Sequence, residues 1–96
     1  SDDERYAFID YIARNPAAGV VVPGSGGVRK VRWAAGGRGK RGGARVIYYY
    51  RSLALPLFLL TVYTKGVQED LSQRQMAEMR NLAKALAETY GRRKNR

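Results

Sequence analysis

The chain has 96 residues, which is typical of one domain, and 45% of them are hydrophobic, which excludes a disordered chain. Cysteine and histidine are both absent, so disulfide bridges, cysteine zinc sites and catalysis by imidazole are excluded, and we expect no metal or other cofactor. Lysine and arginine number 18 against 8 aspartates and glutamates, a formal net charge of +10. The longest apolar stretch is about half a membrane span, which predicts a cytoplasmic protein without a membrane partner.

The positive charge is concentrated in the middle of the chain. Between residues 11 and 68 there are ten basic residues and no acidic one, whereas the two flanks together carry eight of each sign. A basic block between neutral flanks is typical of a surface that binds a polyanion, whereas scattered basic residues usually serve solubility. The middle of the chain is therefore the expected place of a nucleic-acid site.

Apolar spacing and turn signals predict the elements of secondary structure. A first helix ends at Asn15-Pro16, because the residue before a proline avoids the helical region. A second helix begins at Ser72, which has the spacing of a capping box with Gln75, and Gly91 ends it. In chain order the expected elements are a helix over 1–15, strands at about 20–22, 28–33, 44–51 and 57–64, a helix over 72–90 and a basic tail over 91–96.

These elements predict one domain, 1–96, of the α+β class, in which short connections give an antiparallel sheet of three to four strands packed against helices. The strand over 57–64 is apolar enough to be expected in the middle of the sheet. Earlier in the chain, Tyr48 and Tyr50 point to one face of their strand and Tyr49 to the other. We expect one of these faces in the core and the other available to stack on a base.

The glycine-rich loop over 34–43 carries three cations, Arg38, Lys40 and Arg41. Its G-x-G-x-x-G pattern is not followed by the helix that a dinucleotide-binding fingerprint requires. Glycines allow a backbone to lie close to a phosphodiester chain, so contact with a polyanion is favoured over the alternative of a merely flexible hairpin loop.

The ends of two predicted strands carry candidate functional side chains. Arg45 follows the basic loop directly, where a rigidly held guanidinium can clamp a phosphate through two hydrogen bonds; the alternative is an ordinary arginine at a strand edge. Tyr63 and Lys65 end the apolar strand and alternate onto one face; the alternative is a core tyrosine beside a lysine whose stem lies along the surface. The further candidates for binding RNA are five other basic residues of this block: Lys30, Arg32, Arg38, Arg41 and Arg51.

Three segments in the right order resemble the RelE/HigB family of toxins, which belong to type II toxin–antitoxin pairs. They are VVPGSGGVRKVRW (21–33), GKRGGARVIYY (39–49) and LLTVYTK (59–65). The resemblance implies a small α+β fold related to microbial ribonucleases. Family members usually open with a β-strand ahead of the segment that begins here at Ser1, so we expect that strand to be missing and a sheet edge to be free.

The resemblance also implies a ribosome-dependent endoribonuclease that cleaves mRNA in the decoding site. By position, Arg45 matches the family's arginine on the sheet, Lys40 its basic loop residue, and Tyr63 and Lys65 the active positions that end the following strand. The implied partners are mRNA on the ribosome, ribosomal RNA and a cognate antitoxin, HigA-like or RelB-like, with an acidic contact surface.

The residues present allow metal-independent cleavage of RNA, in which a 2′-OH attacks its own phosphate. Arg45 would stabilise the charge of the transition state, Tyr63 would orient the 2′-OH or stack on a base, and Lys65 or Lys40 would move protons if neighbouring cations lower its pKa. Relatives that use histidine as an acid or base differ from this chain, which has none. The alternative function is a non-catalytic RNA- or DNA-binding module.

Overall fold

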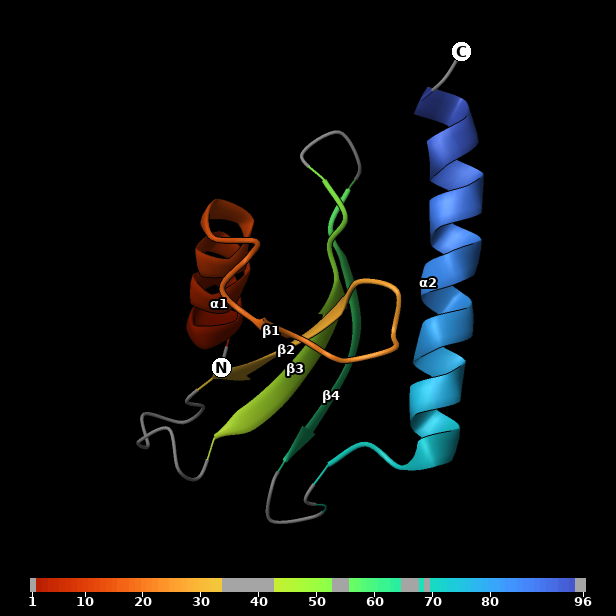
Figure 1. Ribbon diagram of the computed structural model, residues 1–96. Helices are drawn as coiled ribbons and strands as arrows, with labels where there is room; N and C mark the ends of the chain where they lie inside the picture. Colours follow the sequence, from red (N-terminus) through yellow and green to blue (C-terminus); the bar gives the residue numbers. More distant parts are fainter. Residues whose placement is uncertain (1, 34–42, 53–55, 65–67, 69, 95–96) are drawn as a thin grey trace.

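The computed structural model describes residues 2–33, 43–52, 56–64, 68 and 70–94, and it has an α+β fold, as predicted (Figure 1). Four strands form one sheet in the order β1-β2-β3-β4, with each neighbouring pair antiparallel. The two helices lie on opposite sides of this sheet. The elements in chain order are α1 (Asp2–Arg14), β1 (Val20–Val21), β2 (Val28–Trp33), β3 (Ala44–Tyr49), β4 (Phe58–Thr64) and α2 (Gln73–Lys94).

Strand β3 is buried on both faces, because its alternating side chains pack against both helices. Val46 and Tyr48 form one core cluster with Phe8 and Ile12 of α1. Their neighbours Ile47 and Tyr49 belong to a second cluster that contains Ala83 of α2. The expectation that one face of the tyrosines is available to a base is therefore wrong for Tyr48 and Tyr49, which are 0% and 2% exposed.

Strand β4 lies at the end of the sheet in the described part of the chain, not in its middle as its composition predicts. Its apolar character has another cause, since Phe58, Leu60 and Tyr63 pack against the α2 cluster. Leu59 and Val62, by contrast, are 49% and 58% exposed. A bulge between Ile47 and Tyr48 shifts the β3–β4 register. Hydrophobicity here reports burial by a helix, which a strand at a sheet edge obtains as readily as a central one.

Helix α2 begins where the capping box places it and ends later than predicted. The Gln75 backbone N–H donates to Ser72 Oγ at 3.1 Å, and the Ser72 N–H donates to Gln75 Oε1 at 2.9 Å, which is the reciprocal pattern of a capping box. The helix continues through Gly91 to Lys94, so the basic tail predicted over 91–96 is largely helical. Glycine inside a helix costs about 1 kcal/mol, and the basic residues after it favour a helix C-terminus.

Strand β2 has the predicted bounds, and the remaining elements apart from α2 differ from the predictions by one or two residues at an end. β1 has two residues and ends at Val21, β3 ends at Tyr49 instead of residue 51, and β4 begins at Phe58 instead of residue 57. In the described part of the chain, neither helix is long and apolar enough to span a membrane.

The connection between α1 and β1 is fixed to the sheet by one phenol. Tyr48 Oη donates to the Pro16 carbonyl at 2.7 Å and accepts the Gly19 N–H at 2.8 Å. A Cβ at Gly19 would lie 2.8 Å from Tyr48 Oη and 2.9 Å from the Lys30 carbonyl oxygen, so only glycine fits here. Burial raises the pKa of Tyr48, against the lowering effect of the Gly19 hydrogen bond, so the phenol remains a donor at neutral pH.

Tyr48→Phe is expected to lower the free energy of unfolding by about 1–3 kcal/mol, because it leaves the Pro16 carbonyl and the Gly19 N–H without their partner. Urea denaturation followed by circular dichroism measures this change. Tyr6→Phe removes a hydroxyl from a residue that is 67% exposed and serves as the matched control, with an expected change within about 0.5 kcal/mol. Equal stability of Tyr48→Phe and the wild type would contradict the assigned role.

Candidate functional site

The structure brings four of the predicted site residues together on the α2 side of the sheet. Arg45 on β3 lies directly opposite Tyr63 on β4 and, on its other side, directly opposite Arg32 on β2. Lys30 is two residues from Arg32 and therefore points to the same face. Three neighbouring strands thus supply three cations and a phenol to one region.

Of the remaining predicted residues, only Arg51 belongs to the described part of the chain. Lys40 and Lys65, with Arg38 and Arg41, fall outside the described residues. Arg51 is exposed and follows the opposite end of β3, so it lies apart from Arg45. The predicted alternation of Tyr63 and Lys65 onto one face stays a prediction.

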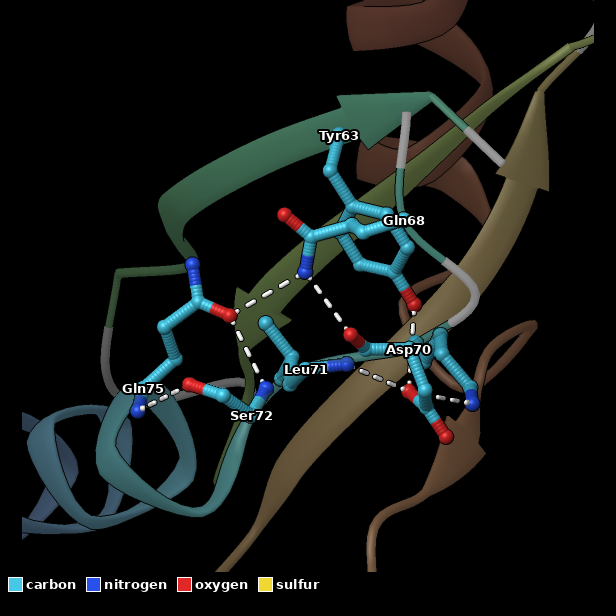
Figure 2. A network of polar contacts seen from close by, with 7 residues as sticks. Tyr63, Gln68, Asp70, Leu71, Ser72 and Gln75 are labelled. Carbon is cyan, nitrogen blue, oxygen red and sulfur yellow. Dashed lines mark hydrogen bonds and ion pairs between the residues drawn. The ribbon is translucent and has the colours of Figure 1, made fainter. Parts of the chain in front are cut away.

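Asp70, which the sequence analysis did not single out, joins this region through one carboxylate oxygen (Figure 2). Its Oδ1 accepts the Leu71 N–H at 2.8 Å, the Tyr63 hydroxyl at 3.2 Å and the Lys30 ammonium at 3.3 Å. The backbone hydrogen bond from Leu71 is the largest cause that lowers the pKa of Asp70; burial opposes it, and the contacts with Lys30 and Tyr63 lower the pKa further. The carboxylate is therefore ionised at neutral pH and fixes both partners.

The Tyr63 hydroxyl is held in its protonated form. Burial raises the pKa of Tyr63, and the charge and hydrogen bond of Asp70 raise it further, while the charge of Arg45 acts in the opposite direction. A phenol whose pKa lies above its ordinary value donates hydrogen bonds at neutral pH and does not act as a base there. Tyr63 is thus a hydrogen-bond donor in this site.

Arg45 is the buried cation of the site, with 8% of its surface exposed. Its Nη1 is buried and has no hydrogen-bond partner among the described residues. A buried N–H without a partner is costly, and the like charge of Arg32 directly opposite is unfavourable as well. An anion bound at this position would satisfy the nitrogen and neutralise the pair.

Arg29 also has a buried nitrogen without a hydrogen-bond partner among the described residues, its Nε, but its other contacts hold the framework. Its Nη1 donates to the Gly19 carbonyl at 2.8 Å, and its guanidinium lies 5.9 Å from the centre of the Tyr50 ring. It lies on the α1 side of β2, because it precedes Lys30 in a strand whose side chains alternate. The guanidinium of Arg29 therefore serves the framework.

A chain of side-chain hydrogen bonds connects the site to the start of α2 (Figure 2). Gln68 Nε2 donates to the Asp70 carbonyl at 2.7 Å and to Gln75 Oε1 at 3.1 Å. Gln75 Oε1 also accepts the N–H of Ser72, the residue that caps the helix. The backbone that carries Asp70 is thereby held by the same groups that begin the helix.

Asp70→Asn is expected to lower the pKa of Tyr63 towards its ordinary value, because it removes the negative charge that stabilises the protonated phenol. An NMR titration of protein labelled with ¹³C at the tyrosine Cζ measures the shift, and Tyr63→Phe assigns the signal. Asp10→Asn is the control, since Asp10 pairs with Arg14 on α1. An unchanged Tyr63 titration in Asp70→Asn would contradict the assigned contact.

One comparison with known proteins bears on this site. A family model described as the RelE toxin of the RelE/RelB toxin–antitoxin system matches residues 22–94. The matched range includes β2, β3, β4 and α2, and therefore every described residue of the site.

Proposed function

We propose that this chain, which belongs to the RelE family of toxins from RelE/RelB toxin–antitoxin systems, is an endoribonuclease that cleaves mRNA on the ribosome. Membership of the family implies an antitoxin partner. Messenger RNA and ribosomal RNA as further partners belong to this proposal. The narrower resemblance to HigB toxins stays a prediction.

The observation that carries the proposal is the buried guanidinium of Arg45. Its Nη1 has no hydrogen-bond partner among the described residues, and Arg32 lies directly opposite. A phosphodiester fits this arrangement, because its two non-bridging oxygens accept N–H groups and its charge offsets the two cations. Lys30 adds a third cation to the region, although its ammonium group forms an ion pair with Asp70.

The reaction that suits these groups is attack of a 2′-OH on the adjacent phosphorus. The new bond joins the 2′-oxygen to phosphorus, the bond to the 5′-oxygen breaks, and the products are a 2′,3′-cyclic phosphate and a 5′-hydroxyl. Negative charge increases on the phosphoryl oxygens in the transition state, where the fixed guanidinium of Arg45 stabilises it. Tyr63 orients the 2′-OH by accepting its hydrogen bond while donating to Asp70, or it exchanges Asp70 for the phosphate as its acceptor.

Proton transfer is assigned to lysine. One lysine, in the neutral form that neighbouring cations would favour by lowering its pKa, takes the proton of the 2′-OH, and a second, protonated group gives a proton to the leaving 5′-oxygen. Lys65 follows Tyr63 by two residues, and Lys40 precedes Arg45 by five, so both belong to segments next to the site. Weak acid–base groups leave much of the rate to substrate orientation, which a ribosome that presents its mRNA supplies.

The antitoxin would inhibit the enzyme by covering this region. A carboxylate is the protein group closest to phosphate in charge and hydrogen-bonding geometry, so an acidic segment fits between Arg45 and Arg32. We therefore propose an acidic contact surface on the antitoxin.

Arg38 and Arg41, which belong to the glycine-rich sequence before β3, complete the proposed RNA contacts.

Arg45→Met is expected to lower the rate of mRNA cleavage by at least about 100-fold, because it removes the donor to the transition state. The free energy of unfolding is expected to stay the same or rise, since a buried charged group, with an Nη1 that lacks a partner among the described residues, is replaced by an apolar side chain of similar length. Primer extension on mRNA from a purified translation reaction measures cleavage, and urea denaturation measures stability.

Arg14→Met, at an exposed arginine of α1, is the control for both measurements of Arg45→Met. Undiminished cleavage by folded Arg45→Met would overturn the catalytic assignment, and a large loss of stability would instead make Arg45 structural. Absence of cut ends with the wild-type protein, together with salt-dependent RNA binding, would favour the non-catalytic binding module.

A further inference from the structure

A cavity of about 470 Å³ opens between α2 and the turn that joins β1 to β2. Figure 1 shows this turn reaching from the sheet towards α2. Its floor is apolar and consists of Tyr49 from β3 with Ala83 and Ala87 from α2. Ala83 and Tyr49 are almost completely buried, so the floor belongs to the core. The volume is within the usual range for small-molecule sites, which is roughly 300–1,000 Å³.

The rim of the cavity is cationic. Arg80 and Lys84, four residues apart on α2, line one side, and Arg51 lines another. All three are exposed, and no acidic residue lines the cavity among the described residues. The positive potential is therefore uncompensated at this place.

The turn residues leave the mouth of the cavity open. Gly24 and Gly26 both line it and have φ angles of 72° and 78°, a region that favours glycine. A Cβ at either position would meet no atom within 4 Å. No side chain of these two glycines covers the backbone on this side, so a ligand can approach the backbone closely.

An apolar floor with a cationic rim matches the two halves of a nucleotide. A base presents flat apolar faces, while its phosphate carries one negative charge. An inorganic anion alone would leave the apolar floor exposed to water. The cavity also lies on the same face of the sheet as Arg45, because Tyr49 and Arg45 are four residues apart on β3, a distance of about 13 Å along the strand.

We propose that this cavity binds one nucleotide of a single-stranded RNA, with the base against the floor and the phosphate at Arg51, Arg80 and Lys84. The inference rests on the proposed function, because it takes the substrate to be RNA. It adds a binding site separate from the groups assigned to cleavage. RNA is favoured over an acidic peptide because one continuous polyanion can occupy both cationic regions of the α2 side.

The test measures binding of a fluorescein-labelled single-stranded RNA of about 12 nucleotides, within the usual site size of such proteins, by anisotropy. Its 2′-hydroxyls are methylated so that attack by the 2′-oxygen cannot occur. Salt is varied from about 50 to 200 mM, and the double variant Arg80→Gln with Lys84→Gln is compared with wild type. Loss of the contact to this one phosphate is expected to reduce the slope of log K against log salt by up to about 0.7.

Two further variants distinguish RNA binding in the cavity from non-specific electrostatic attraction of RNA to the basic protein. Arg14→Gln with Arg74→Gln removes the same charge from exposed helical positions outside the cavity, so the slope is expected to stay at the wild-type value. Ala87→Leu keeps every charge and fills the cavity, so it is expected to weaken binding about 3- to 10-fold, which corresponds to a lost apolar contact. Circular dichroism and urea denaturation verify the fold of each variant.

The outcomes distinguish this inference from the proposed function. Absence of RNA binding by the wild type, or wild-type binding by both the double variant and Ala87→Leu, overturns the nucleotide site, whereas cleavage on the ribosome is scored separately. An equal effect of the Arg14 and Arg74 control overturns it as well. Unchanged RNA binding with weakened antitoxin binding would assign the cavity to an acidic peptide instead.

Discussion

The double burial of β3 determines where the other elements lie. Val46 and Tyr48 require an apolar cover on one face, and Ile47 and Tyr49 require it on the other. Two helices supply these covers, and β2 and β4 occupy the two hydrogen-bonding edges of the strand. A strand that is enclosed on all sides is held rigidly by close packing, so the backbone of a residue at its end has a fixed position.

The residues of β3 consequently have two kinds of role, structural and functional. Its tyrosines serve the framework: Tyr48 holds the α1–β1 connection, and Tyr49 lies under α2. Arg45, at the end where the core gives way to charged groups, has its neighbours on the strands fixed by the same ladder. The core thus maintains a buried guanidinium whose Nη1 has no hydrogen-bond partner among the described residues, whereas an arginine on a flexible loop would turn towards water.

The sequence predicted most of the elements, and the positions of Arg45 and Tyr63 at strand ends, because these depend on local signals. Ser72 caps helix α2, as its spacing predicts. The antiparallel order of neighbouring strands brings the start of β3 to the end of β4, where Arg45 pairs with Tyr63. Asp70 was missed because its partner Lys30 is 40 residues away, and no spacing rule relates such positions. The cavity beside Arg80 was missed for the same reason, since it exists only once α2 packs against the β1–β2 turn.

The hydrogen-bonded chain from Tyr63 to Gln75 connects the site to the first turn of α2 through groups that are exposed to water. Gln75 Oε1 accepts from both Gln68 and the Ser72 N–H, so loss of the first turn of α2 removes two contacts of this chain at once. Water can replace each broken contact, so opening of the chain costs little free energy. The amide protons of Leu71 and Gln75, which donate to side-chain oxygens of this chain, are therefore expected to exchange faster than those of the buried strand β3.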